Sequence, residues 1–155
     1  DEGRAGIQAV TPEKVQGYLD AAAKYAMALP EAQPRYGIVG FCWGGQRSFL
    51  HAVHSPTLGA SVVYYGVSPT REQLASVRAP VLGLYGGNDN RVNATVPPAD
   101  SAMKALGKTF EPHIFEGAAH GFLRQHSGAA GPANLKAWQE AWPLTVAFFK
   151  KDLGS

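Results

Sequence analysis

The stretch Tyr36-Gly-Ile-Val-Gly-Phe-Cys-Trp-Gly-Gly45 decides the fold of this chain. Its first six residues form a short run that is apolar on both faces, which is typical of a strand buried inside a parallel sheet. Residues 44–53 follow with the pattern of a helix. We therefore predict a strand, a tight turn at Cys42 and a helix, the unit from which parallel α/β sheets are built.

The alternation of strand and helix continues on both sides of this unit. We predict a first helix with Thr11 as N-cap and Pro12 at its first position, and a last, amphipathic helix that is bent or broken near Pro143. The predicted elements are helices at 12–29, 44–53, 97–106 and 133–151, a short polar helix or turn at 69–77, and strands at 36–41, 60–65, 80–85 and 109–115. This alternation predicts the α/β class, with one parallel sheet, helices on both faces and right-handed crossovers.

Cys42 lies in the pattern Gly40-Phe-Cys-Trp-Gly44, which is that of a nucleophile elbow with cysteine in place of serine. We expect both glycines to be needed because side chains there would collide with the neighbouring helix and strand. The start of the following helix favours the thiolate, so we expect a lowered thiol pKa. The amide of Trp43 is the expected donor to an oxyanion. The alternative is an inert buried thiol at a glycine-rich turn.

Asp89 and His120 each lie in a glycine-rich loop after a predicted strand. Asp89 can accept a hydrogen bond from a histidine ring, which sets the tautomer and stabilises the imidazolium; the alternative is a turn or a helix cap. His120 stands among small residues that leave its ring accessible to a substrate; the alternative is an ordinary surface histidine. We expect His51 and His54, on the helix after Cys42, to pack or to face solvent.

Taken together, these three residues follow three of the four predicted strands. Sheets of this class bind ligands at the carboxyl ends of their strands. The chain order Cys42, Asp89, His120 gives nucleophile, acid and base in the order typical of the α/β-hydrolase fold. We therefore predict that the three side chains form one catalytic site.

Three stretches of the sequence resemble the dienelactone hydrolase (carboxymethylenebutenolidase) family. They are the opening stretch at residues 36–45, Pro80-Val-Leu-Gly-Leu-Tyr-Gly-Gly-Asn-Asp89 and Glu116-Gly-Ala-Ala-His-Gly-Phe122. The resemblance runs over nearly the whole chain, and a cysteine in the elbow is fairly specific to this family. It implies Cys42, Asp89 and His120 as the catalytic triad.

The resemblance also suggests two further roles in the site. It implies that Arg124, four residues after His120, binds a substrate carboxylate; the alternative is a solvated loop charge. It implies that Trp43 lines the pocket, with a packing role as the alternative.

The chain departs from the family pattern in its length. Members of the family are longer, and the part without a counterpart here is the front of the fold: the first strands, the loop with the second oxyanion donor, a glutamate that contacts the resting cysteine and part of the substrate clamp. We therefore expect residues 1–155 to form a single, incomplete α/β-hydrolase domain that lacks the N-terminal strands. Its uncovered strand at 36–41 is a pairing liability, so we expect association with the missing N-terminal half or a homo-oligomer. With one oxyanion donor, we expect a rate loss on the order of 10²- to 10³-fold.

The expected activity is hydrolysis of a small-molecule ester or lactone of the dienelactone type. Cys42 would attack the carbonyl to form a thioester, and His120 would activate the water that cleaves it. Two alternatives remain open at this point. One is a broad-specificity esterase or promiscuous phosphotriesterase of the same fold, and the other is a non-catalytic, truncated domain.

Composition excludes several other classes of function. The 155 residues are 45% hydrophobic and 17% charged, with a net charge of +2 spread along the chain, so we expect no nucleic-acid partner. No apolar stretch approaches the roughly 18 residues of a membrane span. The single cysteine cannot form an internal disulfide, and no Cys/His cluster suggests a metal, so we expect neither metal nor cofactor. A reducing compartment is permitted, and we expect the cytoplasm.

Overall fold

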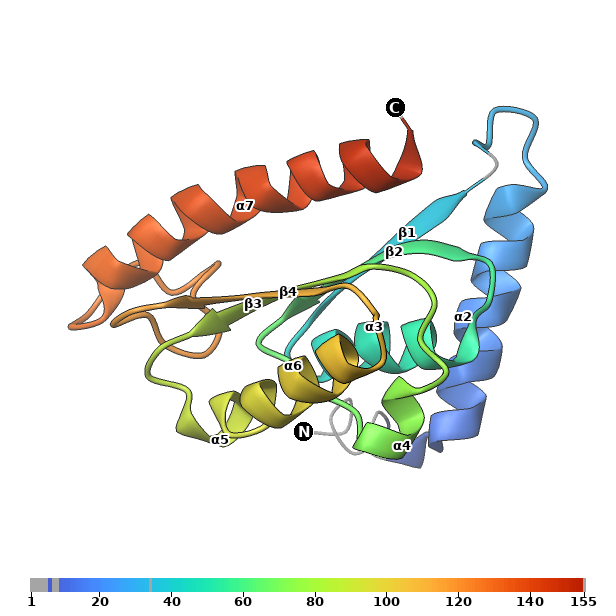
Figure 1. The fold of residues 1–155 in the computed structure, drawn as a ribbon. Coiled ribbons are helices and arrows are strands. Elements are labelled where there is room, and N and C mark those ends of the chain that lie inside the picture. The colour runs from blue at the N-terminus through green and yellow to red at the C-terminus, as the bar shows by residue number, and fades with distance from the viewer. Residues whose placement is uncertain (1–5, 7–8, 34, 155) are drawn as a thin grey trace.

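The computed structural model describes residue 6 and residues 9–33 and 35–154. The other residues of the predicted 1–155 domain lie outside the described part. Four parallel strands form one sheet in the order β1-β2-β3-β4, which confirms the predicted parallel sheet (Figure 1). The strands are β1 (Tyr36–Phe41), β2 (Leu58–Tyr64), β3 (Val81–Gly86) and β4 (Phe110–Phe115).

Helices cover both faces of this sheet, as predicted. They are α2 (Pro12–Met27), α3 (Trp43–His54), α4 (Arg71–Leu74), α5 (Asn90–Asn93), α6 (Val96–Ala105) and α7 (Gly131–Leu153). Figure 1 shows α7 across one face, with α3 and α6 on the other. The short helix α5 was not predicted. Thr11 caps α2 as expected, with its hydroxyl accepting from the amide of Lys14 at 3.3 Å.

The central strands β2 and β3 are almost entirely buried because the sheet has a core on each side. Alternate residues of a strand point to opposite faces. In β3, Val81 and Tyr85 pack with Phe49 and Met103 on the α3 and α6 side. Leu82 and Leu84 point to the opposite face and pack with buried residues of α7.

Two predictions about these elements are wrong in detail. Of the predicted bend or break near Pro143, the break is wrong: α7 is one helix of 23 residues that continues through the proline. Buried residues of α7, including Ala141 before the proline and Phe148 after it, pack against the same face of the sheet and hold the helix together despite the missing amide. The strand β1 is not buried on both faces, because Val39 and Phe41 are 37% and 40% exposed. It pairs with β2 along one edge and has no described strand along the other, as expected for a strand with a neighbour on one side only.

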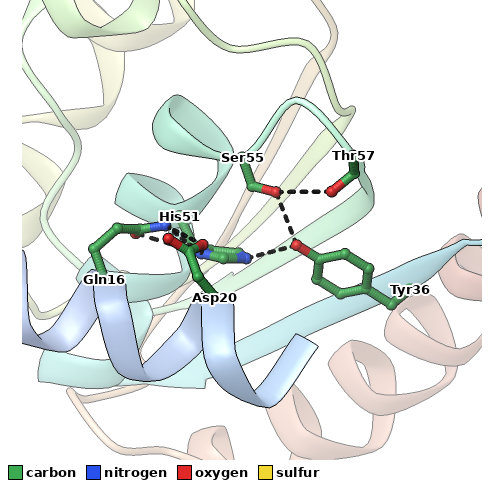
Figure 2. A network of polar contacts seen from close by, with 6 residues as sticks. All are labelled: Gln16, Asp20, Tyr36, His51, Ser55 and Thr57. Carbon is green, nitrogen blue, oxygen red and sulfur yellow. Dashed lines mark hydrogen bonds and ion pairs between the residues drawn. The ribbon is translucent and has the colours of Figure 1, made fainter. Parts of the chain in front are cut away.

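A polar network joins α2 to α3 and β1. Val15 is the one buried residue of α2, so apolar packing contributes little to holding this helix. His51 of α3 is 1% exposed, and its two ring nitrogens contact Gln16 Nε2 at 3.0 Å and Tyr36 Oη at 2.9 Å. Tyr36 Oη also contacts Ser55 Oγ at 2.8 Å (Figure 2). A neutral histidine ring satisfies both of its contacts, with one nitrogen accepting and the other donating.

This network predicts a loss of stability in mild acid. Burial lowers the pKa of His51 from its usual 6.5; Asp20 of α2, at 4.0 Å, opposes this and His54 adds to it. A group whose pKa is lower in the folded state contributes stability above the unfolded pKa, and that stability is lost as pH falls through the folded pKa. We therefore expect the urea midpoint to fall as pH drops below 6.5.

The variant His51→Gln tests this expectation. Its midpoint should change less than that of the wild type between about pH 7.5 and about pH 5.5, because glutamine does not titrate. His54→Gln is the matched control, since His54 lies on the same helix and is exposed; it should keep most of the wild-type pH dependence, because His54 is the smallest of the three causes that shift the pKa of His51. Equal pH dependence in the wild type and His51→Gln would show that His51 is not the group responsible.

Candidate active site

Cys42 occupies a strained turn between β1 and α3. Its φ of 54° lies in the left-handed region, which costs a residue with a side chain on the order of 1–3 kcal/mol. A Cβ on Gly40 would overlap the carbonyl of Gly44, so the first predicted glycine is needed. The prediction for Gly44 is wrong, because a Cβ there meets nothing within 4 Å. The second tight position is Gly45, where a Cβ would overlap the carbonyl of Tyr64.

Trp43 is the first residue of α3. The first amides of a helix have no partner within the helix, so the Trp43 amide can donate to an oxygen that forms beside Cys42. The Trp43 side chain is 44% exposed, and the guanidinium of Arg47 lies over its ring at 4.9 Å. The ring thus packs with a neighbour on its own helix, one turn away.

The thiol pKa of Cys42 is raised rather than lowered, which corrects the expectation based on the helix start. Burial is the largest cause, because it disfavours the thiolate. The charge of Arg124 lowers the pKa, Asp89 raises it, and Arg91 lowers it. The resting residue is therefore a thiol, and a base is needed to activate it.

Asp89 and His120 form the close contact of this site. His120 Nδ1 donates to Asp89 Oδ2 at 2.5 Å, across 31 residues of sequence. The Asp89 side chain is 8% exposed and that of His120 is 37% exposed, so the carboxylate is buried and the ring reaches the surface. The other carboxylate oxygen accepts from the amide of Val92 at 3.4 Å and caps α5. The two roles considered for Asp89, helix cap and histidine partner, are both present.

Tyr65 was missed by the sequence analysis although it follows the remaining strand, β2. Its φ is 41°, and its ring lies 5.0 Å from the His120 ring between centroids. Burial raises the pKa of its phenol, and a charge on Cys42 raises it further. Tyr65 thus lies against His120, and it packs in the same apolar cluster as Cys42. No hydrogen bond joins those two residues within the described part of the chain.

Two arginines place positive charge near the thiol. Arg124 lies in the loop after β4 and Arg91 lies on α5, and both side chains are exposed. The sequence pattern did not lead us to predict a role for Arg91, although it lies only two residues after Asp89. Among the described residues, no group of three or more His, Cys, Asp or Glu is arranged to hold a metal ion. None of the described helices has the length and apolar character of a membrane span.

The profile of the Dienelactone hydrolase family matches residues 3–153 of this chain. A relative from Methylorubrum extorquens, "Putative carboxymethylenebutenolidase", is 34% identical, and the match covers 94% of this chain and 53% of the relative. The mouse "Carboxymethylenebutenolidase homolog" is 29% identical, over 95% of this chain and 60% of the relative. The chain thus spans little more than half the length of these curated relatives.

Solved structures show the same fold. A "Putative Dienelactone Hydrolase" from Klebsiella pneumoniae superposes with a TM-score of 0.81 at 30% identity, covering 92% of this chain and 63% of that one. The "Dienelactone Hydrolase-like Promiscuous Phospotriesterase P91" from metagenomic libraries superposes with a TM-score of 0.68 at 21% identity, covering 95% and 65%. The second likeness concerns the fold alone.

Proposed function

This chain belongs to the dienelactone hydrolase family, and from that premise we propose that it carries the Cys42–His120–Asp89 machinery of a carboxylic ester or lactone hydrolase. The proposal depends above all on the 2.5 Å contact between His120 and Asp89. Support comes from the cysteine of the elbow, which precedes α3 at the carboxyl end of a parallel strand in the same sheet. Because the chain spans only part of its relatives' length, the activity of the whole protein is part of the proposal.

The proposed reaction begins with proton transfer from the thiol. Since burial raises the pKa of Cys42, His120 Nε2 takes the proton as the sulfur attacks the carbonyl carbon. The C–S bond forms, the carbonyl electrons move onto oxygen, and the Trp43 amide donates to that oxyanion. Asp89 holds the imidazole by Nδ1 and stabilises its charged form.

The second half of the proposed cycle releases the enzyme. The tetrahedral intermediate collapses, the C–O bond breaks, and the leaving oxygen takes the proton from His120, which leaves a thioester on Cys42. His120 then takes a proton from water, the hydroxide attacks the thioester, and the C–S bond breaks. The sulfur recovers the proton from His120, so no other reactant is consumed.

A substrate panel tests the proposed class. We expect the protein to hydrolyse p-nitrophenyl esters and a dienelactone. Hydrolysis of a range of neutral esters with weak selectivity would favour a broad esterase, and hydrolysis of a phosphotriester would favour an activity like the one for which P91 is named. No turnover of any of these by folded protein would favour the non-catalytic alternative.

We also propose that another strand covers the open side of β1 in the active protein. Among the described strands β1 pairs with β2 alone, and the unpaired backbone groups of an edge strand invite pairing. Its Val39 and Phe41 are also 37% and 40% exposed. The part of the family fold that this chain does not span would supply such a strand and a second oxyanion donor, and a second copy of this chain would supply a strand alone. Mass in solution and activity with and without an added N-terminal half distinguish these cases; a fully active monomer of this chain would contradict both.

Arg124 is expected to select anionic substrates. The variant Arg124→Gln should lower kcat/KM for a carboxylate-bearing lactone by about 10- to 100-fold, the equivalent of one charged hydrogen bond. Neutral p-nitrophenyl acetate should lose far less, through the further rise in the pKa of Cys42 when the arginine is removed. Arg71→Gln, at an exposed position on α4, is the control. An equal loss with both substrates would exclude a carboxylate-binding role.

A further inference from the structure

One buried amide side chain holds the loop that carries His120. Asn134 lies on α7 and is 1% exposed. Its Oδ1 accepts from the backbone amide of Ala119 at 2.8 Å, and its Nδ2 donates to the backbone carbonyl of Gln125 at 2.6 Å. Both hydrogen-bonding ends of the side chain are therefore used on the same loop.

The two backbone groups bound by Asn134 flank the functional residues of the loop. Ala119 directly precedes His120, and Gln125 directly follows Arg124. A single side chain thus fixes both ends of the segment that carries the proposed base and the proposed carboxylate-binding cation.

The start of this loop is also tied to the neighbourhood of Asp89. The backbone amide of Asn88 donates to the carbonyl of Ala118 at 2.9 Å, and its side-chain amide donates to the carbonyl of Gly117 at 3.0 Å. A Cβ on Gly86 would lie 2.7 Å from the Ala118 carbonyl oxygen, so the loop packs closely on the end of β3. The backbone just before His120 is therefore held between the Asp89 loop and α7.

We propose that Asn134 is a positioning residue that sets where the His120 ring meets Asp89. This inference rests on the proposed function. The asparagine amide carries a donor and an acceptor on two separate atoms, without charge, and both are used here. Removing it leaves a buried N–H and a buried carbonyl without partners, and the loop that carries His120 then loses its anchor on α7.

The experiment compares three variants with the wild type. Asn134→Ala removes both hydrogen bonds, Asn134→Asp keeps an acceptor for Ala119 and loses the donor to Gln125, and Thr145→Val is the matched control. Thr145 is buried on the same helix and bonds to Tyr64 Oη at 2.7 Å and to the carbonyl of Ala141 at 3.1 Å, and none of its described hydrogen bonds goes to the loop that carries His120. Each protein is assayed for kcat and KM, for unfolding midpoint, and for the NMR signal of the proton between His120 Nδ1 and Asp89.

For Asn134→Ala we expect kcat to fall by about 10- to 100-fold, because small misplacements of reacting groups cause losses of this order. We also expect the His120 imidazole signal to broaden or disappear. Asn134→Asp should lose less kcat, because the anchor next to His120 remains, and should show a larger relative rise in KM for the anionic lactone. Thr145→Val should lose stability and keep both kcat and the imidazole signal.

Wild-type kcat and an unchanged imidazole signal in folded Asn134→Ala would overturn the proposal, as would equal losses in Thr145→Val. If Asn134→Ala does not fold, Asn134→Asp decides: wild-type values of kcat, of KM for the anionic lactone and of the imidazole signal together would overturn the proposal. The NMR signal needs no substrate, so it tests Asn134 even if the wild type hydrolyses no ester.

Discussion

Replacing Cys42 with alanine is expected to lower kcat/KM for ester hydrolysis by about 10⁴-fold or more. The variant lacks the atom that forms the covalent intermediate, and water must then attack the ester directly. The fold should change little, because alanine adopts the same φ of 54° at no greater cost than cysteine and leaves only a small gap. Hydrolysis of p-nitrophenyl acetate and of a dienelactone, with the unfolding midpoint measured alongside, checks both statements.

Two further variants make this test specific. Cys42→Ser offers a much weaker acid than the thiol, so we expect residual activity between those of wild type and Cys42→Ala. Ser76→Ala, a change of similar size at an exposed position, should have no effect. Wild-type turnover by Cys42→Ala would remove the thiol from the mechanism.

Asp89→Asn is expected to lower kcat by about 10⁴-fold while leaving stability nearly unchanged. An asparagine amide that donates to His120 Nδ1 forces the proton onto Nε2, and that nitrogen can then no longer accept a proton from the thiol. Asparagine is as good an N-cap as aspartate, so the bond to the amide of Val92 and the helix α5 should persist.

The separation of activity from stability is the informative part of this prediction. Asp100→Asn is the matched control, because Asp100 makes an i,i+4 ion pair with Lys104 on α6 and has no place in the proposed site. It should cost at most about 0.5 kcal/mol and no activity. Full activity in Asp89→Asn would show that the contact with His120 is structural.

The sheet and the contact between Asp89 and His120 could be predicted, the sheet from local patterns and the contact from the order of its strands. The predicted bounds of each strand lie within one or two residues of the observed ones. The contact between Asp89 and His120 followed from topology, since the carboxyl ends of neighbouring parallel strands lie at one edge of the sheet. The short helix α5 was not predictable in this way, because its four residues are mostly polar and too few to show a helical period.

Other parts of the site depend on packing that no local pattern contains. The start of α3 predicted a lowered thiol pKa, but burial of Cys42 outweighs it, and burial is set by residues distant in sequence. The place of Tyr65 beside His120 and the bonds of Asn134 to the histidine loop depend in the same way on how the strand ends and α7 meet. Each of these is a contact between segments that the sequence presents as separate.

The most direct test of the account is to locate the acyl group during hydrolysis. His120→Ala should still form a thioester slowly at alkaline pH, where the Cys42 thiol ionises without a base, and should be unable to cleave it. After mixing with p-nitrophenyl acetate, acid quenching and digestion, we predict one acetyl group on the Cys42 peptide of this variant, while the wild type turns over. Turnover by the wild type with no acetyl group on Cys42 in either protein would contradict the account.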